Sequence, residues 1–119
     1  MTDLIASFSS GKGTAAHVMK VIEGMEWDNI FLIVPEEFEG QFKKPNNAEI
    51  ITVDTTKTIT DMAAHIHHSL NGKTKDFEVG LNLVSGSGRE HMAILDAVLK
   101  LGMGIRLVAL TKEGVKTLW

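Results

Sequence analysis

Short apolar runs alternate with amphipathic segments along the chain. Strands are predicted where consecutive residues are apolar, at 4–8, 30–34, 49–54, 77–84 and 105–110, with a short final strand at 115–119. Helices are predicted where apolar residues recur every three or four positions, at 14–25, 58–70 and 89–101. This alternation predicts an α/β, Rossmann-like fold with a mostly parallel central sheet, helices on both faces and a short antiparallel edge at the C-terminus. We expect residues 1–119 to form this single domain.

The helical periodicity also predicts which side chains form the core. In the third helix the expected inward-facing residues are Met92, Leu95, Val98 and Leu99. The methionines at positions 19, 25 and 62 fall on apolar helix faces and are likewise expected in the core. We expect Trp27 and Trp119 to be packing residues rather than platforms for a stacked base.

Helix ends are marked by residues that bond to the free backbone groups there. Thr58, three residues before Asp61, resembles a capping box with Asp in place of the usual Glu. Asn71 and Gly72 predict the end of the same helix.

Two glycine- and serine-rich loops carry the candidate chemistry, because each joins a predicted strand to a predicted helix. Backbone amides at a helix N-terminus bind phosphate, and glycines allow its close approach. If the first and fourth strands are neighbours, the two loops lie together at one anion site. The candidate ligand-binding residues are Ser9, Ser10, Gly11, Lys12 and Gly13 in the first loop, and Asn82, Ser85, Gly86, Ser87, Gly88 and Arg89 in the second.

Each loop also has a plainer interpretation. The first is an imperfect P-loop, since Ala6 replaces the first glycine and Gly13 separates Lys12 from Thr14. Either loop could serve only as a tight structural turn. In the second loop, however, Arg89 in the first helical turn opposes the helix dipole, which is easier to understand if an anion binds there.

The histidines and the acidic segment after the second strand are further candidate functional groups. His65, His67 and His68 are expected to be solvated helix residues, and no metal site or cofactor is predicted. His91 and His17 follow the two loops and are candidates for ligand contact or proton transfer. The acidic segment 36–39 is expected to be solvated, with a position on the rim of the site as the alternative.

Composition narrows the range of partners. The net charge of −3 provides no basic field for a membrane surface or for long duplex nucleic acid. The chain has no cysteine, so disulfide and thiolate chemistry are excluded. No apolar stretch approaches the roughly 20 residues needed to span a bilayer, and no signal peptide is indicated. We therefore expect a cytoplasmic protein.

The second loop resembles a known signature. CRISPR-associated Rossmann-fold (CARF) domains carry, after their fourth strand, a pattern like Asp/Asn-hydrophobic-Thr/Ser-Gly-Gly-x-Arg/Lys-x-Met, to which residues 82–92 are similar, with one or two extra loop residues. A small-residue motif after the first strand is matched by residues 9–13, and the order of elements agrees along nearly all of the chain. The resemblance implies a homodimer that binds a cyclic or short oligoadenylate, the CRISPR-linked messenger of antiviral defence. Most members also carry an effector domain, and residues 1–119 contain none, so we expect a stand-alone small member.

Four functions follow as hypotheses. The first is a homodimeric sensor in which Lys12 and Arg89 neutralise phosphates of an oligonucleotide ligand. The second is a metal-independent ring nuclease that uses the ribose 2′-OH as nucleophile, with Ser10, Lys12, Arg89 and His91 as catalytic candidates. The third is a non-catalytic interaction subunit, and the fourth is a P-loop-like phosphotransferase.

Overall fold

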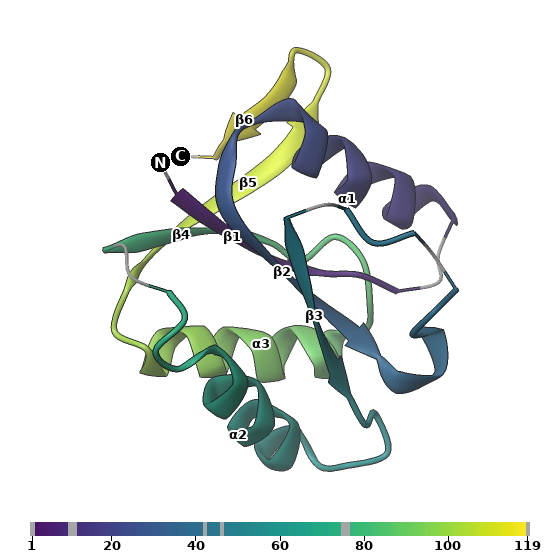
Figure 1. The fold of residues 1–119 in the computed structure, drawn as a ribbon, viewed down its shortest axis with the longest axis vertical. Coiled ribbons are helices and arrows are strands. Elements are labelled where there is room, and N and C mark those ends of the chain that lie inside the picture. Colours follow the sequence, from purple (N-terminus) through teal and green to yellow (C-terminus); the bar gives the residue numbers. More distant parts are fainter. Residues whose placement is uncertain (1, 10–11, 42, 46, 75–76, 119) are drawn as a thin grey trace.

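The structure, a computed structural model, contains nine helices and strands and one short 3-10 turn in the part of the chain that it describes (Figure 1). It describes residues 2–9, 12–41, 43–45, 47–74 and 77–118, with the backbone alone at Lys12 and Gly13. The elements are β1 (Thr2–Ser7), α1 (Lys12–Gly24), β2 (Trp27–Pro35), η1 (Glu36–Phe38), β3 (Ala48–Val53), α2 (Ile59–Leu70), β4 (Glu78–Asn82), α3 (Gly88–Lys100), β5 (Gly104–Thr111) and β6 (Gly114–Thr117).

The strands form one six-stranded sheet in the order β3-β2-β1-β4-β5-β6. Neighbouring strands from β3 to β5 are parallel, and β6 pairs antiparallel with β5. The predicted Rossmann-like α/β fold with an antiparallel C-terminal edge is therefore confirmed. The first and fourth strands are direct neighbours, with Leu4 opposite Gly80 and Ala6 opposite Asn82. The strand order thus reverses between β1 and β4.

Helices cover both faces of the sheet, as the sequence predicted (Figure 1). Alternate residues of β1 point to opposite faces, because the side chains of a strand have a period of two. Leu4 and Ala6 join the core cluster that contains the apolar residues of α1. Ile5 joins the other cluster, which contains the buried residues of α2 and α3.

The α1 face contains a close contact that requires glycine. The Trp27 indole lies where a side chain at position 80 would project, and a Cβ on Gly80 would lie 2.9 Å from its ring atoms. The indole nitrogen donates to the Val21 carbonyl at 3.1 Å, which joins the start of β2 to α1. Trp27 is buried, so its prediction as a packing residue is confirmed. Trp119 lies outside the described residues.

The predicted ends of α2 are confirmed. The Thr58 side chain accepts a hydrogen bond of 3.1 Å from the backbone amide of Asp61, which satisfies one free amide of the first turn. Asn71 is the C-terminal capping residue, and Gly72 follows with a φ of 83°, which glycine adopts at little cost.

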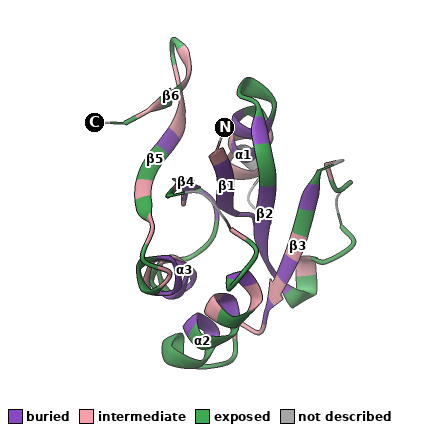
Figure 2. Cartoon of the chain, turned by 60° about the vertical axis from the view of Figure 1, so that its left-hand side comes forward, coloured by how far each residue is buried: buried purple, intermediate pink, exposed green. Residues whose placement is uncertain are grey.

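The predicted inward positions on α3 are partly wrong. Val98 is buried, but Met92 and Leu99 are each 60% exposed. Met25 is also exposed, at 40%. Helix α3 has apolar residues around much of its circumference, and it buries Ala93, Ile94 and Ala97 together with Val98. The small side chains of Ala93 and Ala97 allow α3 to pack closely against the core. Hydrophobic periodicity alone could not distinguish this buried face of α3 from its exposed apolar face (Figure 2).

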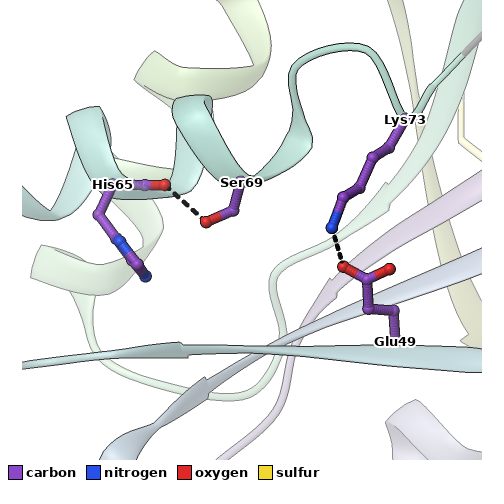
Figure 3. Close-up of polar contacts among 4 residues, drawn as sticks. All are labelled: Glu49, His65, Ser69 and Lys73. Carbon is purple, nitrogen blue, oxygen red and sulfur yellow. Dashed lines mark hydrogen bonds and ion pairs between the residues drawn. The ribbon is translucent and has the colours of Figure 1, made fainter.

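Polar side chains of α2 and the following turn cover edge strand β3. Lys73 forms an ion pair with Glu49, and Nε2 of His65 bonds to the Thr52 carbonyl at 2.8 Å. The Ser69 hydroxyl donates to the His65 carbonyl at 2.8 Å (Figure 3). Charged and hydrogen-bonded groups at a sheet edge discourage pairing with another chain. The described residues include no group of histidine and carboxylate side chains suited to a metal ion. None of the described helices is both long and apolar enough to cross a membrane.

Candidate functional site

The loops after β1, β3 and β4 lie at the same edge of the sheet, because these strands run parallel. Ligands of open α/β sheets bind beyond the carboxyl ends of the strands, at the point where the strand order reverses. Here that point is between β1 and β4. The loops that flank it are those in which the sequence placed its candidate ligand-binding residues.

Ser85 joins the two candidate loops by hydrogen bonds. Its side-chain oxygen accepts from the Ser9 backbone amide at 2.9 Å and from the Thr14 hydroxyl at 3.2 Å. Ser85 itself is fully buried. The loops therefore converge, as predicted if β1 and β4 are neighbours, but the Ser85 side chain connects them and does not face solvent.

Gly86 and His91 hold the second loop in shape. Gly86 has a φ of 97°, and a Cβ there would lie 2.6 Å from the Ser7 hydroxyl oxygen. A side chain at this position is therefore disfavoured both by the backbone conformation and by a steric clash. Nε2 of His91 lies 2.7 Å from the Ser85 carbonyl. Because a carbonyl only accepts, that nitrogen carries the proton and donates it. The conformation of the second loop is thus fixed by its close approach to Ser7 of β1 and by the hydrogen bond from His91 of α3.

A capping box opens α3 at the candidate site. The Ser87 side chain accepts from the Glu90 amide at 3.4 Å, and the Ser87 amide donates to the Glu90 carboxylate at 2.8 Å. Gly88 and Arg89, the first two helical residues, have amides without an intrahelical partner because of their position. A Cβ on Gly88 would have no atom within 4 Å, so this end of α3 is open.

Asn82 forms a buried hub at the end of β4. Its amide nitrogen donates to the Val108 carbonyl at 2.8 Å and lies 3.1 Å from Nε2 of His17. The same His17 nitrogen accepts from the Leu110 amide at 3.3 Å. Strand β5 continues past the end of β4, so Asn82 and His17 bond to the backbone groups of β5 that β4 no longer reaches. These hydrogen bonds give Asn82 and His17 a structural role.

Arg89 joins α3 to the loop after β3. Its guanidinium donates to the carbonyl oxygens of Thr55 and Lys57 at 2.9 and 2.6 Å. This loop and the second glycine loop thus lie side by side. Arg89 itself is exposed. Its hydrogen bonds to backbone carbonyls differ from the phosphate contact that the sequence predicted.

The structure thus brings Ser9, Asn82 and residues 85–89 to one edge of the sheet. Ser10 and Gly11 lie outside the described residues, and Lys12 and Gly13 form the start of α1. Ligand contact by any of these residues remains a prediction. The capping box of α3 was missed, although Ser87 and Glu90 have its spacing.

A second overlooked signal is the spacing Gly-x-Gly-x-x-Ala over residues 11–16. This spacing follows the first strand of many dinucleotide-binding domains. Comparison of the chain with protein-family models, with curated proteins and with solved structures found no match.

Proposed function

We propose that this domain is a sensor that binds a cyclic or short oligoadenylate at the edge between β1 and β4. The observation that supports it is the direct connection of the two glycine-rich loops through Ser85. A connected pair of loops provides one preformed surface, and a preformed surface loses less conformational entropy when a ligand binds.

The open end of α3 is the part of this surface suited to phosphate. Its first helical residues are Gly88 and Arg89, both exposed. Backbone amides at a helix N-terminus, together with the helix dipole, attract anions. The Glu90 carboxylate is bonded to the Ser87 amide, which offsets part of its opposing charge. Lys12 begins α1 next to the first loop and supplies the cation of this proposal.

The described contacts favour a binding protein over a ring nuclease. Nε2 of His91 donates to a backbone carbonyl, and the Arg89 guanidinium donates to two others. A general acid or base must reach the substrate, and both groups are occupied in holding loops. We therefore assign Arg89 and His91 as positioning residues and retain cleavage as the alternative function.

We further propose that the sensor is a homodimer formed through α3 and β5. Met92 and Leu99 on α3 are each 60% exposed, and Leu107 on β5 is 48% exposed. Leu95 of α3 and Ile105 of β5 pack against the same core cluster. The two elements therefore lie next to each other on one side of the molecule (Figure 2).

A charged pair accompanies this apolar surface. On α3, Asp96 pairs with Lys100. A two-fold interface requires a surface that complements itself. An apolar centre with charges of both signs nearby has that property.

Isothermal titration calorimetry against cyclic oligoadenylates of different ring size, and against linear ones, tests the binding proposal. We expect saturable heat with at least one of them and a stoichiometry of one ligand per two chains. Absence of heat with the whole panel would overturn the proposal. Incubation of labelled ligand with excess protein separates the alternatives, since a sensor returns it unchanged and a ring nuclease yields linear product.

A further inference from the structure

A pocket of about 290 Å³ lies at the carboxyl ends of β2 and β3, and its lining residue Lys57 accepts a hydrogen bond from Arg89 of the second glycine loop. Val53 and Met62, each 2% exposed, contribute its apolar part. The polar residues that line it are Glu36, Asp54, Lys57, Asp61 and His65. Pockets for small molecules have this mixture of apolar surface and a few polar groups, and begin at about 300 Å³.

Hydrogen bonds hold three of the lining residues in place. Oδ1 of Asp54 accepts from the Thr56 amide at 2.9 Å and from its hydroxyl at 2.5 Å. His65 bonds to the Thr52 carbonyl, and the Lys57 carbonyl accepts from Arg89. The pocket wall is therefore preorganised, and Arg89 connects it to the open end of α3.

The lining residues select for a ligand that donates hydrogen bonds and carries no negative charge. Three carboxylates and one lysine line the pocket, so an anionic group is repelled from it. The hydrogen bonds from the Thr56 side chain and amide lower the pKa of Asp54, which keeps its carboxylate ionised as an acceptor. Hydroxyl groups suit carboxylate acceptors, and the apolar part suits a flat, weakly polar ring.

The sequence supports the same conclusion independently. Glu36 directly follows β2, which ends at Pro35. It lies 23 residues after Gly13 (36 − 13), in a βαβ unit whose sequence at residues 11–16 has the spacing Gly-x-Gly-x-x-Ala. In dinucleotide-binding domains an acidic residue at about this spacing bonds the ribose 2′-hydroxyl. Of the acidic segment after β2, Glu36 lines this pocket.

We propose that this pocket holds the ribonucleoside part of the ligand, with the ribose hydroxyls on Glu36 and Asp54 and the base against Met62 and Val53. The proposal rests on the nucleotide-binding function above and adds its nucleoside subsite. The charges separate the two halves of a nucleotide: the neutral nucleoside fits the carboxylate-lined pocket, and the phosphate fits the helix end beyond Arg89.

Nuclear magnetic resonance tests the two subsites separately with three probes. Adenosine is expected to shift the Met62 methyl and Val53 resonances, and the exposed Met92 methyl serves as the internal control. With 2′-deoxyadenosine we expect about tenfold weaker binding, because one charge-assisted hydrogen bond is lost. Tripolyphosphate is expected to shift the amides of Gly88 and Arg89 and to leave Met62 unchanged.

Matched variants assign the hydroxyl contacts. Glu36→Gln and Asp54→Asn are each expected to weaken adenosine binding about tenfold, since a neutral acceptor forms a weaker hydrogen bond than a carboxylate. Glu39→Gln is the control, because Glu39 is an exposed residue of the same acidic segment and does not line the pocket.

The outcomes separate the two proposals. A response to tripolyphosphate with no response of Met62 to adenosine would overturn the nucleoside pocket and leave the phosphate site standing. The reverse pattern would retain the pocket and reject the phosphate site at α3. Equal binding of adenosine and 2′-deoxyadenosine, or a Met62 response to spermidine in place of adenosine, would also overturn the ribonucleoside assignment.

Discussion

The backbone amide of Ser9 donates a hydrogen bond of 2.9 Å to the side-chain oxygen of Ser85, across a sequence separation of 76 residues. This bond crosses the point at which the strand order of the sheet reverses. The bond joins the loop after β1 to the loop after β4, so that the two form one surface. The proposed ligand-binding site depends on this connection.

Replacing Ser85 by alanine should destabilise the fold. The Ser9 amide and the Thr14 hydroxyl would lose this acceptor at a fully buried position. We expect the free energy of unfolding to fall by about 1–3 kcal/mol, measured by chemical denaturation. Ser69→Ala is the control, since Ser69 bonds within its own helix and should cost less than about 0.5 kcal/mol. Equal effects of the two changes would contradict the role of Ser85.

Alanine should have opposite consequences at the two glycines of the second loop. Gly86→Ala combines a positive φ with a clash against Ser7, so we expect a loss of at least about 1–2 kcal/mol in unfolding free energy. Gly88→Ala places a methyl group in open space at the first residue of α3, where it should be neutral or slightly stabilising. Chemical denaturation of both variants measures the difference, and similar losses would show that this loop geometry is wrong.

A carboxylate at position 88 should separate ligand binding from stability. Aspartate at the first position of α3 interacts favourably with the helix dipole, so Gly88→Asp should leave stability unchanged or raise it by about 0.3–1 kcal/mol. The same charge would repel a phosphate bound there, and the affinity measured by calorimetry should fall at least about tenfold. Gly88→Asn, of the same shape without the charge, is the control. Undiminished affinity of Gly88→Asp would rule out phosphate at this helix end.

Replacing Arg89 should loosen the loop after β3. Without the guanidinium, the carbonyls of Thr55 and Lys57 lose their donors. We expect faster amide hydrogen exchange over residues 55–58 in Arg89→Ala, because local opening becomes less costly. Arg106→Ala is the control, as Arg106 pairs with Glu78 on the strands. Unchanged exchange over residues 55–58 in Arg89→Ala would count against a positioning role.

Charges on the apolar surface of α3 should prevent dimerisation. Met92 and Leu99 are exposed, so Met92→Glu and Leu99→Glu should leave the monomer folded and shift the protein to a monomer in analytical ultracentrifugation. Lys20→Glu, at an exposed position on α1 on the other face of the sheet, should leave the dimer intact. A monomeric wild-type protein at high concentration would reject the dimer outright.

Within the described residues, local sequence signals predicted the three α-helices and six strands to within a few residues. The run 30–34 is apolar enough to mark a strand buried on both faces, and β2 extends from Trp27 to Pro35 around it. Thr58 and Gly72 marked the ends of α2 because capping depends on neighbouring residues. The glycine content of the two loops likewise indicated where the chain turns from strand to helix.

Only the tertiary structure decided which roles the polar residues of the site have. The sequence by itself determined the α/β fold class and the two loops, since backbone preference and hydrophobic period act over a few neighbouring residues. It could not determine that Ser85 connects the loops, that Asn82 and His17 bond to β5, or that Arg89 reaches the loop after β3. These contacts join residues far apart in the chain. They form because the parallel pairing of β1 with β2 and β4, of β2 with β3 and of β4 with β5 brings the strand ends to one edge.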